Sequence, residues 1–79
     1  MVRIRLELAD AVKRRRKERR LTPSQLAALL GSSQSRIAKM EAAAESVSLD
    51  LLVRSFLALG ATTEELATVI GRVEERKAG

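Results

Sequence analysis

The sequence predicts an all-α protein, folded as one compact domain of five short helices. Leucine and alanine, with 12 residues each, supply most of the 46% apolar content, and both are strong helix formers. Apolar residues recur at spacings of three and four, with Ser, Thr and Gly between the repeats. Four glycines, one proline and few β-branched runs argue against an all-β fold. We treat residues 1–79 as a single domain, because neither a low-complexity linker nor an internal repeat interrupts them.

The composition excludes several kinds of functional site. The chain has no Cys and no His, so it lacks a thiol nucleophile, zinc-ribbon ligands and the commonest general base. We therefore expect no metal, no cofactor, no small-molecule substrate and no enzymatic activity. The apolar runs are far shorter than the roughly 18 residues of a membrane span, and we expect a cytoplasmic protein with no membrane partner. The net charge of +5 favours an anionic partner.

Positive charge is concentrated in the first predicted helix, residues 8–19. Seven of the 15 positive charges lie within residues 13–20, either as a solvated helix face or as a set of phosphate contacts. The stripe facing the core consists of Leu8, Ala11 and Val12, and the arginines close to it are Arg15, Arg16 and Arg19. We expect these arginines to lay their methylene groups on the core or to find carboxylate partners.

The seven residues before this helix allow two interpretations. Residues 2–8 alternate apolar and charged side chains, which is typical of a short strand or an extended N-terminal arm. The same residues can also form the first turns of the helix.

The second and third helices have clear starts and a defined turn between them. Thr22 is a good N-cap, Pro23 suits the first helical position, and Gln25 completes a capping box. Gly31 can adopt the left-handed conformation that ends the helix over residues 23–30. The next helix begins near residue 34, with Ser33 as its N-cap, and it has one apolar and one polar side. Residues 42–47 form the connection that follows.

Two more apolar helices complete the chain. Ser48 caps a helix over residues 49–59 that is apolar nearly all round and ends at Gly60, so we expect it at the centre of the core. Thr62 and Glu65 form another capping box. The apolar stripe of the last helix, at i, i+3, i+4 and i+7, consists of Leu66, Val69, Ile70 and Val73. Because the first four helices can close a core without it, we expect this stripe to contribute to a dimer interface, with Leu59 or the N-terminal arm as further candidates.

The most informative stretch is residues 22–41, in which two helices are joined by Gly-Ser-Ser. A larger side chain at Ala27 would separate the helices, and Ile37 fills the angle between them. A three- to four-residue turn containing Gly is typical of a helix-turn-helix, whose second helix can enter the major groove of DNA.

This stretch resembles the Xre family of helix-turn-helix proteins, the phage repressor and Cro type. The resemblance covers residues 8–60 and is strongest in the run LAALLGSSQSRIAKME from Leu26 to Glu41. It implies a lambda-repressor-like domain that binds double-stranded DNA as a homodimer on a palindromic operator and regulates transcription, usually as a repressor. It also implies an ion pair between Arg16 and Glu41. The chain departs from the family at Pro23, at Arg15, and at Arg20 and Ala43, which stand where the family often has glycine.

The resemblance assigns base contacts to the outward face of the second helix of the motif, at Gln34, Ser35 and Lys39, and the small Ala38 on the same face is a further candidate. Gln can bind adenine, Lys can bind guanine, Ser can serve either, and the Ala methyl can contact a thymine methyl. The candidate phosphate contacts are Arg16, Arg19, Arg20, Thr22, Ser24, Gln25, Ser32, Ser33 and Arg36. A left-handed Arg20 at the usual glycine position should cost about 1 kcal/mol.

Other functions remain as alternatives. The family also includes antitoxins, which bind a toxin protein and repress their own operon. The motif could also serve only to build a three-helix core. RNA binding is less well supported, because one Phe and no Trp or Tyr leave no stacking platform for unpaired bases.

Overall fold

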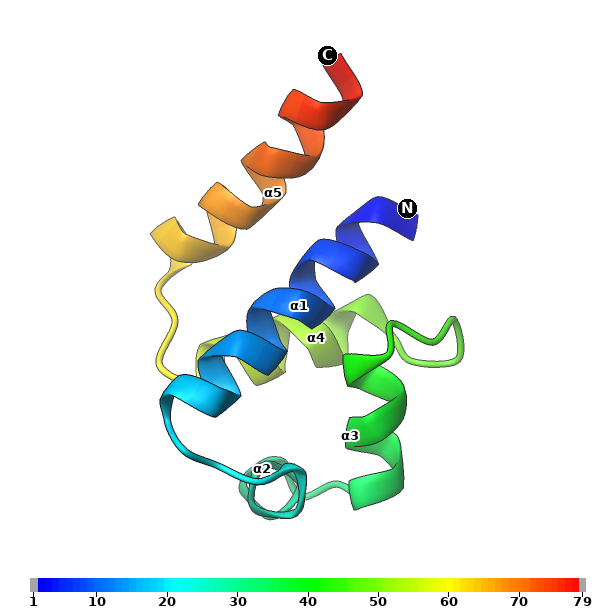
Figure 1. The fold of residues 1–79 in the computed structure, drawn as a ribbon, viewed down its shortest axis with the longest axis vertical. Helices are drawn as coiled ribbons and strands as arrows, with labels where there is room; N and C mark the ends of the chain where they lie inside the picture. Colours follow the sequence, from blue (N-terminus) through cyan, green and yellow to red (C-terminus); the bar gives the residue numbers. More distant parts are fainter. Residues whose placement is uncertain (1, 79) are drawn as a thin grey trace.

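The computed structural model describes the backbone of residues 2–78 and the side chains of residues 3–72. The five helices are α1 (Val2–Glu18), α2 (Pro23–Leu30), α3 (Gln34–Glu41), α4 (Leu49–Ala58) and α5 (Thr63–Ala78). Residues 2–78 contain no strand, so the predicted all-α class is confirmed. In Figure 1, α1 crosses in front of α4, α2 and α3 lie at one end, and α5 runs beside α1 and extends beyond the other helices.

The first helix is longer at its start than predicted. It begins at Val2, not at residue 8, and ends at Glu18. Of the two interpretations of residues 2–8, the first turns of the helix are therefore confirmed, and the strand or extended arm is wrong. Ile4 and Leu8, one helical turn apart, face the core, and Leu8 is fully buried. Leu6 is 54% exposed, because the helical period carries it to the opposite side. The alternation of apolar and charged residues over residues 2–8 therefore does not correspond to a strand.

The core is formed mainly by α1 and α4, and α2 and α3 each add two buried apolar side chains. The fully buried apolar side chains are Leu8, Val12, Leu26, Ile37, Met40, Leu52 and Leu59. As predicted, α4 is central, since it packs against α1, α2 and α5. One residue of its apolar pattern, Leu57, is nevertheless 38% exposed.

The first four helices all end in the same way. At each end one residue has a positive φ: Arg20 (57°), Gly31 (63°), Ala43 (57°) and Gly60 (91°). The amide after each of these donates to a carbonyl five residues earlier, as from Ser32 to Ala27 at 2.8 Å. This Schellman arrangement satisfies the last free carbonyls of a helix and turns the chain sharply. Two of the four positions are not glycine, including the Arg20 predicted to be left-handed.

The last helix is part of the core, unlike the prediction that the first four helices close without it. α5 packs on both α1 and α4. Val69 is only 5% exposed and Leu59 only 1%, so neither is free to form a dimer interface. Leu66 is half-buried against the core, Ile70 is 36% exposed, and the side chain of Val73 lies outside the described residues.

Candidate nucleic-acid interface

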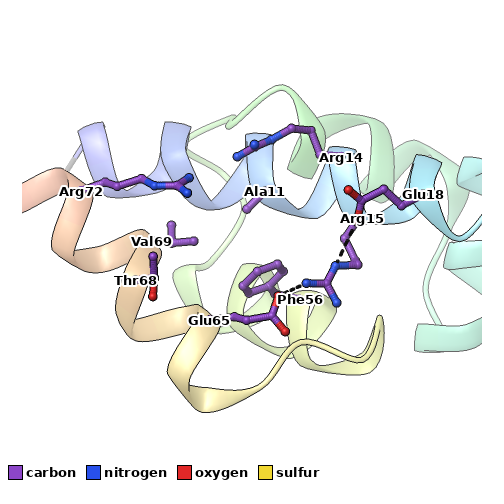
Figure 2. Close-up of a pocket in the computed structure, with 9 residues that line it drawn as sticks. All are labelled: Ala11, Arg14, Arg15, Glu18, Phe56, Glu65, Thr68, Val69 and Arg72. Atoms are coloured by element: carbon purple, nitrogen blue, oxygen red, sulfur yellow. Dashed lines mark hydrogen bonds and ion pairs between the residues drawn. The ribbon is translucent and has the colours of Figure 1, made fainter.

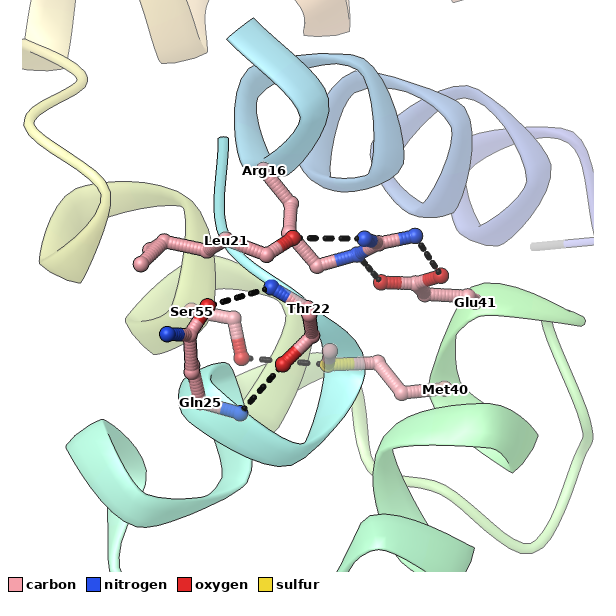
Figure 3. Close-up of polar contacts among 7 residues, drawn as sticks. All are labelled: Arg16, Leu21, Thr22, Gln25, Met40, Glu41 and Ser55. Carbon is pink, nitrogen blue, oxygen red and sulfur yellow. Dashed lines mark hydrogen bonds and ion pairs between the residues drawn. The ribbon is translucent and has the colours of Figure 1, made fainter. Parts of the chain in front are cut away.

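The second and third helices form the predicted pair around a tight turn. The Thr22 hydroxyl accepts the Gln25 amide at 3.1 Å, and the Gln25 side-chain oxygen accepts the Thr22 amide at 2.8 Å, so the capping box is complete (Figure 3). Left-handed Gly31 ends α2, and the Ser33 hydroxyl caps α3 by accepting the Arg36 amide at 3.1 Å. Figure 1 shows α2 nearly end-on, while α3 beside it lies roughly in the plane of the view, so the two helix axes are steeply inclined to each other.

The two sides of α3 differ sharply in burial. Ile37 and Met40 are fully buried and fasten the helix to the core. On the opposite side, the four residues expected to contact bases, Gln34, Ser35, Ala38 and Lys39, are all exposed. None of the four side chains makes a hydrogen bond or ion pair within the described residues, so their polar atoms are available to a ligand.

An ion pair joins α3 to α1. Arg16 Nε lies 2.6 Å from Glu41 Oε2, and Arg16 Nη2 lies 3.0 Å from Glu41 Oε1, a bidentate geometry (Figure 3). The third nitrogen, Nη1, donates to the Leu21 carbonyl oxygen at 2.8 Å. The side chains are 9% and 11% exposed, so the pair lies almost entirely inside the fold. Arg16 and Glu41, which the resemblance pairs, therefore meet in the structure.

The same geometry removes Arg16 from the candidate phosphate contacts. All of its guanidinium nitrogens have partners inside the protein, and the residue is only 8% exposed. Binding a phosphate would leave Glu41 as an unpaired and nearly buried carboxylate, which is costly. Its two predicted roles therefore exclude each other, and the structure favours the ion pair.

The other candidate phosphate contacts lie at the surface around the motif. Ser32 is half-buried. The exposed members of this set are Arg20, Thr22, Ser24, Gln25, Ser33 and Arg36. Arg19 is also exposed, but its guanidinium lies beside Gly60, where an added Cβ would collide with it. Arg19 is therefore directed toward the turn between α4 and α5.

Two contacts that support α3 are not apparent from the sequence. The hydroxyl of Ser55 on α4 donates to the Leu51 carbonyl oxygen at 2.7 Å and lies 3.0 Å from the sulfur of Met40 (Figure 3). Arg5 on α1 donates to the carbonyl oxygen of Val47, in the loop that follows α3. A serine in an apolar helix and an arginine in an alternating run carry no sequence signal for these long-range contacts.

An open hollow lies beside the exposed side of α3. Its volume is about 290 Å³, and it is lined by Ser33, Ser35, Arg36, Lys39, Ser46 and Val47. The hollow thus brings the start of α3 together with the loop that Arg5 fastens. Its lining is hydroxyl-rich and basic, which suits the oxygen atoms of a nucleic-acid backbone.

The comparisons with known proteins identify the motif. The family model of a helix-turn-helix domain matches residues 7–69. No curated protein and no solved structure matches the chain significantly. None of the described helices is long and apolar enough to cross a membrane, and the described residues include no cluster of metal-ligating side chains. The exposed α3 and the family match, which covers most of the chain, lead to one conclusion: this protein belongs to the helix-turn-helix domain family, a DNA-binding family that is typically non-enzymatic.

Proposed function

We propose that this protein is an Xre-type transcriptional repressor that binds a specific palindromic operator in double-stranded DNA as a homodimer. The observation that carries the proposal is the contrast between the two sides of α3. Its polar side is exposed and makes no hydrogen bond within the described residues, while its apolar side is fixed in the core. A helix held rigidly in this way can enter a major groove without rearrangement.

In the proposed complex, Gln34, Ser35 and Lys39 read the edges of the bases. The Gln34 amide can form two hydrogen bonds with adenine, and Lys39 can donate to O6 and N7 of guanine. Ala38, between them, is small enough to contact a thymine methyl. The assignments of Gln34, Ser35 and Lys39 rest on the resemblance, and the exposure of all four residues supports them.

The phosphate contacts would fix the orientation of α3 in the groove. Positive charge comes from Arg20 and Arg36. Hydrogen bonds to phosphate come from Thr22, Ser24, Gln25 and Ser33. Two further candidates at the edge of this surface are Arg19 and Ser32. Such contacts strengthen binding to every sequence and so raise its salt dependence.

We further propose that the homodimer forms through the exposed apolar residues of α4 and α5. Of the predicted stripe, Leu66 and Ile70 stay as candidates, and Leu57 on α4 joins them because it is 38% exposed on a helix that packs against α5. In a homodimer on a palindromic operator, the two α3 helices lie in successive major grooves about 34 Å apart.

The test is selection of bound sequences from a random double-stranded DNA library at two salt concentrations. We expect an enriched inverted repeat whose half-sites are centred about ten base pairs apart. A library without enrichment, whose binding disappears at the higher salt concentration, would reduce the protein to a non-specific binder of phosphate.

Substitutions separate base reading from general attraction. Lys39→Ala should lower the affinity for the selected repeat more than the affinity for a scrambled duplex. Arg54→Ala removes an equally positive side chain from the exposed face of α4 and serves as the matched control. An equal loss on both duplexes for Lys39→Ala would remove this residue from the base contacts.

An antitoxin would also select an operator, so a second assay addresses that alternative. An antitoxin must neutralise a toxin protein, whereas a simple repressor has no such partner. Toxicity of a neighbouring reading frame that disappears on co-expression of this protein would establish the antitoxin function.

A further inference from the structure

A groove on another part of the molecule has no place in the proposed DNA complex. It lies between α1, α4 and α5, has a volume of about 210 Å³, and is shown in Figure 2. Its apolar lining comes from Ala11, Phe56 and Val69, each at most 5% exposed. Its charged lining includes Arg14, Arg15 and Arg72. The groove thus combines apolar walls with guanidinium groups from two different helices.

The two glutamates at this groove are both paired with the same arginine. Arg15 forms ion pairs with Glu65 and, at 3.5 Å, with Glu18 (Figure 2). The same guanidinium lies 5.7 Å from the centre of the Phe56 ring. Arg15 therefore closes one end of the groove, and it leaves neither carboxylate for the other two arginines.

Arg14 and Arg72 are differently placed. Arg14 pairs with Asp10 at 3.0 Å, but both side chains are more than half exposed, so this pair is weak and exchangeable. Arg72 makes no ion pair or hydrogen bond within the described residues. Figure 2 shows both arginines extending over the side of the groove formed by Ala11 and Val69. An anion placed between two guanidinium groups is attracted by both of them.

We propose that this groove binds a small organic anion, with a carboxylate or phosphate group between Arg14 and Arg72 and an apolar body against Ala11, Phe56 and Val69. The sequence predicts no such ligand. A groove of about 210 Å³ suits a compound with one ring or a short aliphatic chain. Guanidinium groups bind carboxylate and phosphate through paired N–H donors, which makes both anions suitable.

The test uses benzoate and phenyl phosphate as probes and benzamide as their uncharged analogue. Amide resonances of the full-length ¹⁵N-labelled protein are followed during titration with each compound. We expect saturable shifts at Ala11, Thr68 and Val69 with both anions and no saturation with benzamide. Shifts confined to residues of α3, or equal shifts with benzamide, would overturn the proposal.

Two pairs of variants show whether the arginines supply the affinity. Arg72→Gln should weaken benzoate binding at least fivefold, while Arg54→Gln on the exposed face of α4 should leave it unchanged. Asp10→Asn should strengthen binding two- to threefold, because it releases Arg14 from its present partner. Asp50→Asn is the matched control, since Asp50 pairs with Arg54 at the same spacing on α4.

Asp10→Asn is expected to raise the affinity for benzoate. A misfolded variant would lose binding, so a gain in affinity cannot result from misfolding. Equal affinities for the wild-type protein, Arg72→Gln and Asp10→Asn would overturn the proposal, because the anion would then not be held between Arg14 and Arg72. The result is also independent of DNA binding, since none of the residues that line the groove belongs to α2 or α3.

Discussion

Arg16 and Glu41 are the pair of residues on which the position of α3 depends most directly. Their bidentate contact is almost fully buried, so removing one partner leaves the other charge without compensation. We predict that Glu41→Ala lowers the free energy of unfolding by about 3 kcal/mol. Urea denaturation followed by circular dichroism measures the change. DNA affinity should fall together with stability.

The control for this prediction is an ion pair of the same chemistry at the surface. Arg54 and Asp50 lie 3.9 Å apart with side chains 62% and 77% exposed. Such a pair contributes at most about 0.5 kcal/mol, so Asp50→Ala should hardly change the denaturation midpoint. A similar loss from both variants would mean that burial does not strengthen the Arg16–Glu41 contact.

Arg20 illustrates a residue whose contributions to stability and to binding oppose each other. Its φ of 57° suits glycine better than arginine, yet its exposed side chain is a candidate phosphate contact. We predict that Arg20→Gly stabilises the fold by about 0.5–1 kcal/mol, the left-handed strain less the entropy of a flexible glycine. The same variant should weaken binding to operator and scrambled duplexes by equal factors. Thermal unfolding and binding titrations measure the two effects.

Gly31 provides the opposite substitution at the same kind of position. Its φ is 63°, and nothing lies within 4 Å of an added Cβ, so any cost of Gly31→Ala is conformational. We expect a loss of about 1 kcal/mol. If Arg20→Gly destabilises instead, the conformation of that residue is not what limits stability there.

At the scale of helices, the start of α5 depends on one carboxylate with two functions. Glu65 Oε1 accepts the Thr62 amide at 3.2 Å and so caps α5, while Oε2 pairs with Arg15 of α1. Glu65→Gln keeps a capping oxygen and loses the ion pair, whereas Glu65→Ala loses both. We predict that the alanine variant loses about 1 kcal/mol more than the glutamine variant.

Hydrogen exchange is the appropriate measurement, because it resolves the opening of α5 from global unfolding. The amides of α5 should lose more protection than those of α4 in both variants. Glu64→Gln, in the same first turn but without an ion pair in the described residues, is the control. Equal loss of protection in every helix would show that α5 does not open separately.

The same scale shows what the sequence can predict. Capping residues such as Thr22, Ser33 and Ser48 place the starts of α2, α3 and α4 correctly, because a cap is a local interaction. The sequence does not decide where α1 begins, residue 2 or residue 8, because no cap marks the start and the alternating run is compatible with either period. The partner of Arg15 is likewise unpredictable, since Glu65 lies 50 residues away and meets it only once α5 docks.

At the scale of the whole molecule, the proposed assembly of two copies depends on which apolar side chains the monomer leaves exposed. The helical spacing of apolar residues identifies the apolar side of α5. It does not show which of these residues are already buried inside the monomer. Val69 packs inside the monomer, whereas Leu57 and Ile70, from two helices in contact, are 38% and 36% exposed. The proposed dimer face therefore omits the buried Val69 and adds Leu57, while the side chain of Val73 lies outside the described residues.

We predict that the double variant Leu57→Asp and Ile70→Asp is a folded monomer, because charge at a dimer face opposes association while the core residues are untouched. Sedimentation equilibrium at tens of micromolar gives the mass. Operator affinity should fall strongly, while affinity for a single half-site should not change, because each subunit keeps its own α3. Leu6→Asp, at another exposed leucine on α1, is the control and should stay dimeric. A wild-type protein that sediments as a monomer, or a double variant that stays dimeric, would rule out this face as the interface.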